Sequence, residues 1–224
     1  MIGDIVEIKP HHLPPAKRIL ELVEDELTKK SGIFTFTIGG ESGSGKSTLS
    51  LAIKTVLEKD ELEVFIFHID DYFKLPPKDN HDKRLEDLSH VGPEEVNLEV
   101  LQNHIEQIKK GSDFLKKPLV HYRENQIREV IVELKKVDVI IAEGTYSTLL
   151  KNIDCKVFML RNYLDTYENR VKRGRDPMDP FTEKVLEIEH NILQNHINMA
   201  DILVDKNYNV KLQKESPQHK QQNN

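Results

Sequence analysis

A glycine-rich segment, GESGSGKS at residues 40–47, constrains the fold of this chain more than any other part of its sequence. The segment matches the pattern Gly-x-x-x-x-Gly-Lys-Ser at every fixed position. An apolar, β-branched run, Ile33–Ile38, precedes it, and a helical pattern, Lys46–Glu58, follows it. A strand, a glycine loop and a helix in this order predict a loop whose backbone N–H groups and helix N-terminus bind phosphate groups. The alternative is a tight glycine–serine turn that binds no ligand.

The residue types of the loop indicate the ligand that it holds. Lys46 is expected to reach the β- and γ-phosphates of a nucleotide, and the Ser47 hydroxyl is expected to bind Mg²⁺. ATP is the expected nucleotide, and GTP stays open as the phosphate donor. The residues expected to surround the phosphates are Gly40, Glu41, Ser42, Gly43, Ser44, Gly45, Lys46, Ser47 and Thr48.

Short apolar runs alternate with helical patterns along the rest of the chain. Such alternation is typical of an α/β fold in which helices cover both faces of a mostly parallel sheet. The sequence therefore predicts a three-layer P-loop sandwich. The expected strands are Ile33–Ile38, Glu63–Asp70, Asp138–Gly144, Cys155–Arg161 and the segment ADILVD at residues 200–205. The expected helices are Lys46–Glu58, the segment that begins at Gly92-Pro93 and ends at Gly111, Leu164–Arg173 and Glu183–Met199.

Three further segments complete the expected organisation. Residues 1–32 are expected to form an N-terminal extension, a strand-like segment followed by a helix over Ala16–Lys30. Residues 33–210 form the main domain, into which FLKKPLVHY and IREVIVEL are expected to insert a two-stranded hairpin that binds the acceptor. Residues 211–224 are polar with no apolar period and are expected to be a disordered tail.

Two aspartates follow the second expected strand in the segment HIDDYF. The carboxyl ends of parallel strands carry the ligand-binding groups of open α/β sheets. A carboxylate at this place could accept the proton of an attacking hydroxyl. Strand alternation puts Asp70 on the same face as His68 and turns Asp71 to the other face. The alternative is a pair of aspartates that form a turn.

A second carboxylate, Glu143, ends the apolar strand in the segment IIAEG. A carboxylate at the end of a buried strand beside a phosphate loop is typical of a Mg²⁺ ligand. We therefore expect Ser47, Asp70 and Glu143 to hold the metal. Glu143 is also an alternative to Asp70 as the catalytic base, and the sequence leaves that choice open. A helix-capping role for Glu143 is the remaining interpretation.

Positive charge gathers in the segment NRVKRGRDP, whereas the chain as a whole has a formal net charge of -6. Arg170 and Arg173 lie one helical turn apart, and Arg175 follows a glycine. Arginines on a mobile lid can stabilise the charge of a transferred phosphoryl group and exclude water. The sequence thus predicts a helical lid with three catalytic arginines. The alternative is a solvated basic face of a helix.

Taken in order, these segments resemble the uridine kinase and phosphoribulokinase family of P-loop kinases over about residues 33–210. The matching segments are GGESGSGKST, IDDYF, PEEVNLEVL, IIAEG, RVKRGRD and ADILV. The resemblance implies that Asp70 is the catalytic base, that Glu143 is a Mg²⁺-associated carboxylate, and that the lid contains the three arginines. It also implies that residues near ADILV border the adenine.

The same resemblance implies transfer of the γ-phosphoryl group of Mg²⁺·ATP to a hydroxyl of a small molecule. Uridine or cytidine is the expected acceptor, with ribulose 5-phosphate, pantothenate or another alcohol as the alternative. Uridine kinases usually have Asp-His-Pro where this chain has Val91-Gly92-Pro93, and they have Tyr-Asp where it has Tyr-Arg. The residues expected to bind the acceptor are Tyr72, His121, Tyr122, Arg123 and Arg128.

Two other classes of function stay open: a nucleotide switch in which water takes the phosphate, and a module that binds ATP without catalysis. The negative net charge argues against a nucleic-acid partner, and the sequence has no apolar run as long as a membrane span. The single cysteine fits a cytoplasmic protein. The expected partners are therefore ATP and a small-molecule alcohol, with neither nucleic acid nor membrane, and a homo-oligomer stays open.

Overall fold

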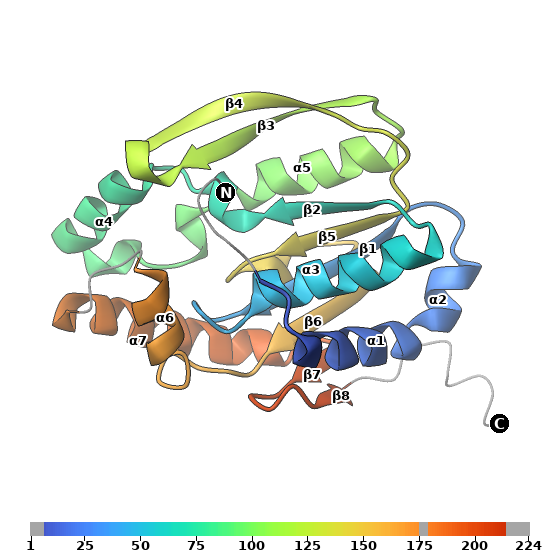
Figure 1. Ribbon diagram of the computed structural model, residues 1–224. Helices are drawn as coiled ribbons and strands as arrows, with labels where there is room; N and C mark the ends of the chain where they lie inside the picture. The colour runs from blue at the N-terminus through green and yellow to red at the C-terminus, as the bar shows by residue number, and fades with distance from the viewer. Residues whose placement is uncertain (1–6, 175–178, 214–224) are drawn as a thin grey trace.

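The computed structural model describes residues 7–174 and 179–213, and for residues 172 and 173 the backbone alone. A six-stranded sheet in the order β2-β5-β1-β6-β7-β8 forms its centre (Figure 1). All neighbouring strands of this sheet are parallel except β8, which is antiparallel to β7. The strands of this sheet are β1 (Phe34–Gly40), β2 (Val64–His68), β5 (Val139–Glu143), β6 (Cys155–Met159), β7 (Ile202–Val204) and β8 (Val210–Leu212). The expected α/β fold with a mostly parallel sheet is confirmed.

Helices cover both faces of the sheet, which gives three layers. Side chains alternate along β5, so that Val139 and Ile141 join a core cluster with α1 and α3 while Ile140 and Ala142 join a second cluster with α5 and α7. The strands are apolar on both faces for this reason. The helices are α1 (Leu13–Leu22), α2 (Glu24–Lys29), α3 (Lys46–Leu57), α4 (Pro77–Glu86), α5 (Leu98–Lys109), α6 (Tyr167–Arg173) and α7 (Pro180–Ile197).

Short 3₁₀ segments connect several of these elements. They are η1 (Pro10–His12), η2 (Glu58–Asp60), η3 (Ile69–Tyr72), η4 (Leu88–His90), η5 (Pro93–Glu95), η6 (Tyr122–Glu124) and η7 (Ser147–Leu149). No helix in the described part of the chain combines the length and the apolar character that crossing a bilayer would require.

The expected hairpin is confirmed as a separate two-stranded sheet, β3 (Phe114–His121) and β4 (Gln126–Glu133) (Figure 1). The η6 segment and Asn125, whose φ is +49°, turn the chain between the two strands. Leu115 packs into the same apolar cluster as Ile105 of α5, while Phe114 and Ile131 stay exposed. The hairpin thus has one buried side, and its turn lies at the end where α4 is found.

The strand register sets the geometry of one edge of the main sheet. Glu143 is paired with Ile38 on β1 and with His68 on β2. Strands β2 and β5 therefore end at one level, immediately before η3 and Gly144, and β1 ends two residues beyond this level, at Gly40, where the glycine loop begins. Helices α4 and α6 lie at this edge (Figure 1), and the side chains that follow these strands can meet there.

The structure corrects the expected position of the two aspartates. Strand β2 ends at His68, and Asp70 and Asp71 lie in the η3 turn rather than on the strand. Strand alternation therefore does not determine their directions. They still face different surroundings: Asp70 lines a cavity, whereas the Asp71 carboxylate is buried against β3.

Other boundaries also differ from the sequence-based expectation. Gly92-Pro93 opens the short η5 segment, and α5 begins only at Leu98. The expected N-terminal helix is divided into α1 and α2 at Val23. ADILVD is not the last strand, because β8 includes two residues of the expected tail and pairs with β7. Residues 214–224 of that tail lie outside the described residues.

The Asp71 side chain joins η3 to the hairpin. Its Oδ2 accepts a hydrogen bond of 2.9 Å from Lys117 Nζ, and its Oδ1 accepts one of 3.1 Å from the Val120 N–H. The Asp71 and Lys117 side chains are only 1% and 8% exposed. An ion pair with so little water around it depends on both partners, because either charge alone would be costly to bury.

We expect the Asp71→Ala variant to lose about 3 kcal/mol of unfolding free energy, because it leaves the Lys117 ammonium buried without its carboxylate. The measurement is urea unfolding followed by circular dichroism. Lys116→Ala is the matched control, since Lys116 forms an exposed ion pair with Glu129 on the same hairpin, and a loss of at most about 1 kcal/mol is expected. Equal losses for the two variants would contradict the assigned role of Asp71.

Candidate active site

The phosphate loop, defined here as residues 40–47, joins β1 to the first turn of α3. Gly40, Gly43 and Gly45 have φ angles of +140°, +76° and +101°, which side-chain-bearing residues rarely adopt. A Cβ on Gly40 would also lie 2.9 Å from both the Cβ and the carbonyl oxygen of Met159. The three glycines are therefore required by the backbone path, which brings the loop around the N-terminus of α3, where an anion is stabilised.

The two polar residues at the start of α3 face different partners. The Lys46 ammonium donates a hydrogen bond of 2.8 Å to the Glu41 carbonyl oxygen, so it lies against the loop. The Ser47 hydroxyl donates one of 2.9 Å to Glu143 Oε1 at the end of β5. His68 Nδ1 lies 2.6 Å from the same oxygen. Because a carboxylate only accepts hydrogen bonds, Nδ1 of His68 carries the hydrogen.

The Ser47–Glu143 pair provides the kind of oxygen ligands that Mg²⁺ prefers. Among residues 7–174 and 179–213, no three His, Cys, Asp or Glu side chains are arranged to hold a metal. Phosphoryl-transfer sites, however, usually bind Mg²⁺ through one or two carboxylates, with phosphate oxygens and water as the remaining ligands. A hydroxyl and a carboxylate 2.9 Å apart beside the phosphate loop therefore fit this ion.

A cavity of about 170 Å³ opens next to the phosphate loop. Ser42 of the loop and Asp70 of η3 both line it, so the loop and the cavity meet at these two residues. The other walls come from α4, the η6 turn and the first half of α7. They include the rings of Tyr122 and Phe181 and the aliphatic side chain of Leu186. Such a mixture of apolar walls and a few polar groups is typical of a small-molecule site.

The main positive charge of the cavity wall, Arg84, is matched by two carboxylates. Its guanidinium contacts Glu95, which has 0% exposure, and lies 3.1 Å from Glu189 Oε1 on α7. Asn80 and the Gly92 N–H also donate to Glu95, each at 2.9 Å. Burial by itself would lower the pKa of Arg84, but the hydrogen bond with Glu95 and the charge of Glu189 raise it. Arg84 therefore stays charged and is held in place.

The expected acceptor residues are only partly brought together. Tyr122 lines the cavity, whereas Tyr72 is buried in the core and its hydroxyl lies 2.9 Å from His104 Nδ1. Burial raises the pKa of Tyr72, and the Asp71 charge adds to this effect. The remaining three residues lie on the hairpin or its turn and are not cavity-lining: His121 and Arg128 contact Glu124, and Arg123 is exposed.

Only one of the three expected lid arginines has a described side chain. Arg170 is buried, its guanidinium donates a hydrogen bond of 3.1 Å to the Tyr163 carbonyl, and it lies over the Tyr167 ring. A Cβ on Gly43 would lie 3.0 Å from Arg170 Cγ. Helix α6 is therefore packed directly on the phosphate loop. The side chain of Arg173 and all of Arg175 lie outside the described residues.

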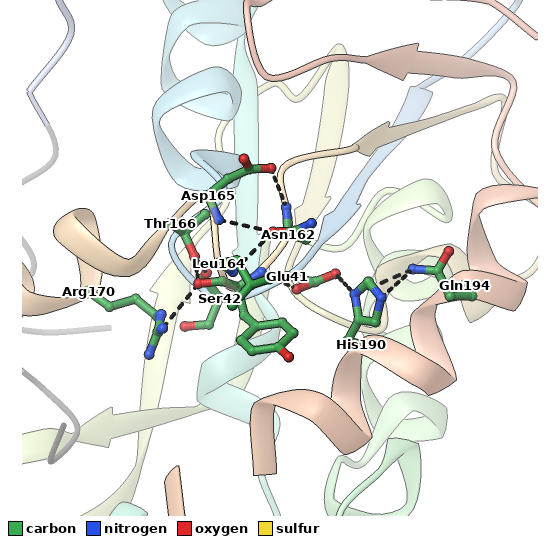
Figure 2. A network of polar contacts seen from close by, with 10 residues as sticks. Glu41, Ser42, Asn162, Leu164, Asp165, Thr166, Arg170, His190 and Gln194 are labelled. Carbon is green, nitrogen blue, oxygen red and sulfur yellow. Dashed lines mark hydrogen bonds and ion pairs between the residues drawn. The ribbon is translucent and has the colours of Figure 1, made fainter. Parts of the chain in front are cut away.

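A network of polar contacts extends from the phosphate loop to α7 (Figure 2). Glu41 accepts a hydrogen bond from the Tyr163 N–H with one carboxylate oxygen, and its other oxygen lies 2.7 Å from His190 Nδ1. Thr166 Oγ1 donates a 2.9 Å hydrogen bond to the Ser42 carbonyl. The loop is thus bonded both to the segment before α6 and to α7.

Several residues of the site carry no signal in the sequence that identifies them. Arg84, Glu95 and Glu189 come from three separate segments, and only the fold brings them together. A partial signal exists on α7, where the buried face contains Glu189 and His196 among Val185, Leu186 and Leu193. A carboxylate on the apolar side of a helix is unusual without a partner, so it could have indicated a buried polar contact.

Comparisons with known proteins agree with this geometry. The profile of the Phosphoribulokinase / Uridine kinase family matches residues 35–175. The chain is similar to a bifunctional alpha-galactosidase/sucrose kinase of Mediterraneibacter gnavus, with 26% identity over 78% of this chain and 20% of that protein. It is also similar to a uridine kinase of Clostridium novyi, with 30% identity over 57% of this chain and 56% of that protein. The matches thus cover less than two thirds of the length of these relatives.

A solved structure extends the likeness at the level of the fold. The D-glycerate 3-kinase of Cryptococcus neoformans superimposes with a TM-score of 0.61 at 14% identity, over 91% of this chain and 99% of that one. The family profile spans both the phosphate loop and the residues of α6, and it covers more than half of the chain. By sequence and by fold, this chain belongs to the phosphoribulokinase and uridine kinase family.

Proposed function

We propose that this protein is a kinase that transfers the γ-phosphoryl group of ATP to a hydroxyl of a small molecule. The observation that carries the proposal is the junction of the phosphate loop with the cavity, where Ser42 and Asp70 line the same space. An acceptor in the cavity would have its hydroxyl near the phosphate held by the loop. Such positioning is the main contribution that a protein makes to phosphoryl transfer.

The loop residues have separate roles in this proposal. The backbone of residues 40–48 surrounds the phosphates, and Lys46 moves from the Glu41 carbonyl to the β- and γ-phosphate oxygens. Ser47 and Glu143 would hold Mg²⁺, and Asp70 stays a predicted third ligand. The metal, when bound, neutralises charge on the phosphate oxygens. His68 keeps the Glu143 carboxylate oriented through its Nδ1–H.

Asp70 is the proposed catalytic base. It lines the cavity in which the acceptor would bind, whereas Glu143 is at the strand end and is bonded to Ser47 and His68 through the same oxygen. The Asp70 carboxylate would accept the hydroxyl proton as the oxygen attacks. Arg170 lies beside Gly43, so it is the proposed arginine that stabilises charge on the transferred group. Arg173 and Arg175 stay predictions of the same role.

The charges around the cavity favour an acceptor without a charge of its own. Arg84 is already matched by Glu95 and Glu189, and Asp70 adds a further carboxylate. Among the described residues that line the cavity, Arg84 is the only lysine or arginine, so a phosphate group on the acceptor would meet these carboxylates with no uncompensated cation in the described wall. Arg128 does not supply one, because it contacts Glu124 and Gln126 on its own hairpin. Neutral hydroxyl groups, in contrast, can donate hydrogen bonds to carboxylates.

We therefore infer that the acceptor is an uncharged polyhydroxylated molecule, a nucleoside or a sugar, rather than a sugar phosphate. Relatives named as a uridine kinase and a sucrose kinase are compatible with both kinds. Tyr122 and Phe181 offer ring faces on which a base or a sugar can pack. Uridine or cytidine thus stays the first acceptor to test, with a neutral sugar next.

The acceptor class is tested by incubating the protein with Mg²⁺·ATP and single candidates, followed by mass analysis of products. The panel contains uridine, cytidine and sucrose as neutral acceptors, and ribulose 5-phosphate, pantothenate and D-glycerate as anions. We expect a phosphorylated product from a neutral acceptor and none from the anions, because Arg84 is already compensated. A product from ribulose 5-phosphate alone would overturn the charge-based inference.

Replacing Lys46 with alanine is expected to weaken binding of Mg²⁺·ATP at least about tenfold, because hydrogen bonds between an ammonium and phosphate oxygens are lost. Isothermal titration calorimetry measures this change without any acceptor. Lys59→Ala, at an exposed lysine beyond the end of α3, is the control and should bind ATP as the unchanged protein does. An unchanged affinity in Lys46→Ala would show that the nucleotide does not bind in the phosphate loop.

Asp70→Asn is expected to lower kcat about 100-fold or more while the dissociation constant of Mg²⁺·ATP changes by less than about threefold. The amide keeps the size of the side chain but cannot take the acceptor proton. Turnover with the best acceptor of the panel is the measurement, and Asp82→Asn, at an exposed position on α4, is the control. Full activity in Asp70→Asn would instead favour Glu143 as the base.

A further inference from the structure

A glutamate inside the phosphate loop raises an electrostatic problem. Glu41 follows the first glycine of the loop, where the phosphate groups of a nucleotide would lie close to its backbone. A carboxylate directed at those phosphates would repel them. The fold turns the Glu41 side chain away, so that it is only 7% exposed and both of its oxygens are bonded. Such a buried, fully bonded carboxylate is held in one position.

The first bond of Glu41 reaches the segment that precedes α6. One oxygen accepts the Tyr163 N–H, and the Tyr163 carbonyl in turn accepts a hydrogen bond from Arg170. Thr166 Oγ1 donates to the Ser42 carbonyl at 2.9 Å (Figure 2). The loop and the helix that carries the lid arginine are therefore connected through the Glu41 side chain as well as through loop carbonyls.

The second bond of Glu41 reaches α7 through His190. Because the carboxylate can only accept, His190 donates through Nδ1, and its Nε2 lies 3.2 Å from the side-chain nitrogen of Gln194. The neighbouring residue on α7, Glu189, lines the cavity and contacts Arg84. Two adjacent residues of one helix thus contact the phosphate loop and the acceptor cavity.

We propose that Glu41 is a positioning residue that fixes the phosphate loop to α7 through His190 and to α6 through Tyr163. A loop that is already fixed loses less conformational entropy when the nucleotide binds, so binding is tighter. If the Glu41 bonds are removed, the loop keeps its contact with Thr166 but loses its bonds to His190 and to the Tyr163 N–H, and the nucleotide must supply more of its order. Because α7 also forms a wall of the acceptor cavity, the same bond transmits a shift of that wall to the loop. The proposal depends on the proposed function only in that the loop binds nucleotide phosphates.

The test measures, by isothermal titration calorimetry, how tightly the protein binds Mg²⁺·AMP-PNP, in which AMP-PNP is a non-hydrolysable ATP analogue. We expect Glu41→Ala and His190→Phe each to weaken binding about tenfold, since each leaves a buried polar partner of the network unpaired. The double variant should be no weaker than Glu41→Ala alone, because both changes remove the same connection. Losses that multiply in the double variant, or an unchanged affinity in Glu41→Ala, would overturn the proposal.

Two variants separate positioning from a general loss of structure. Glu41→Gln keeps an oxygen for the Tyr163 N–H and an amide beside His190, so it should bind AMP-PNP within about threefold of the unchanged protein. Gln194→Ala removes the outer neighbour of His190 and should have no effect. Thermal unfolding checks that each variant is folded. If Glu41→Ala does not fold, the AMP-PNP affinities of His190→Phe and Gln194→Ala are compared instead. Equal affinities in these two variants would overturn the proposal.

A second readout reports on the Glu41 bond itself. Hydrogen exchange of the Tyr163 amide, followed by NMR, should be at least about tenfold faster in Glu41→Ala than in Gln194→Ala, because the amide loses its acceptor. Unchanged protection in Glu41→Ala would contradict the connection to α6. Neither readout requires a phosphorylated acceptor. The proposal for Glu41 can therefore fail while the proposed kinase function stands, and it can still be tested if no acceptor in the panel is phosphorylated.

Discussion

The register of three parallel strands is the constraint on which the rest of this site depends. Pairing of Glu143 with Ile38 on one side and His68 on the other ends β2 and β5 at one level and places the end of β1, at Gly40, beside them. The phosphate loop, Glu143 and the η3 turn then have to lie together. A shift of one residue in β5 would turn Glu143 to the opposite face and separate it from Ser47. The apolar faces of β5 oppose such a shift, because Ile140 and Ile141 pack in different core clusters.

The proposed acceptor side is held by buried charges rather than by the sheet. Glu95 has no exposed surface and bonds to Arg84, Asn80 and the Gly92 N–H, so η5 and α4 are fixed to each other through one carboxylate. Arg84 continues this network to Glu189 on α7. Buried ion pairs add little net stability but are costly to break. Their consequence here is a cavity wall with a fixed guanidinium whose charge is already compensated.

The sequence predicts the positions of the residues in the proposed donor half of the site better than those in the proposed acceptor half, for a physical reason. The glycine loop and Glu143 follow from local patterns, because each is placed by the strand immediately before it. Whether Asp70 lies on the strand or in the following turn depends on the residue at which β2 ends, and local residue types do not determine that residue. Arg84 and Glu189 are 105 residues apart, and their contact requires the packing of α4 on α7. Tyr72 was expected at the acceptor but is buried in the core, because η3 directs its ring inward.

Helix α7 joins these two halves. Glu189 faces the cavity and His190 faces the phosphate loop, so a rotation of the helix about its axis would change both contacts at once. The donor and acceptor sites of a kinase must come together without admitting water, and a helix bonded to both is one physical means of linking their positions. The carboxylate that makes this link lies inside the phosphate loop, where a negative charge would otherwise oppose nucleotide binding. The contact with His190 directs the Glu41 carboxylate away from the phosphates, and the same contact holds the loop in place.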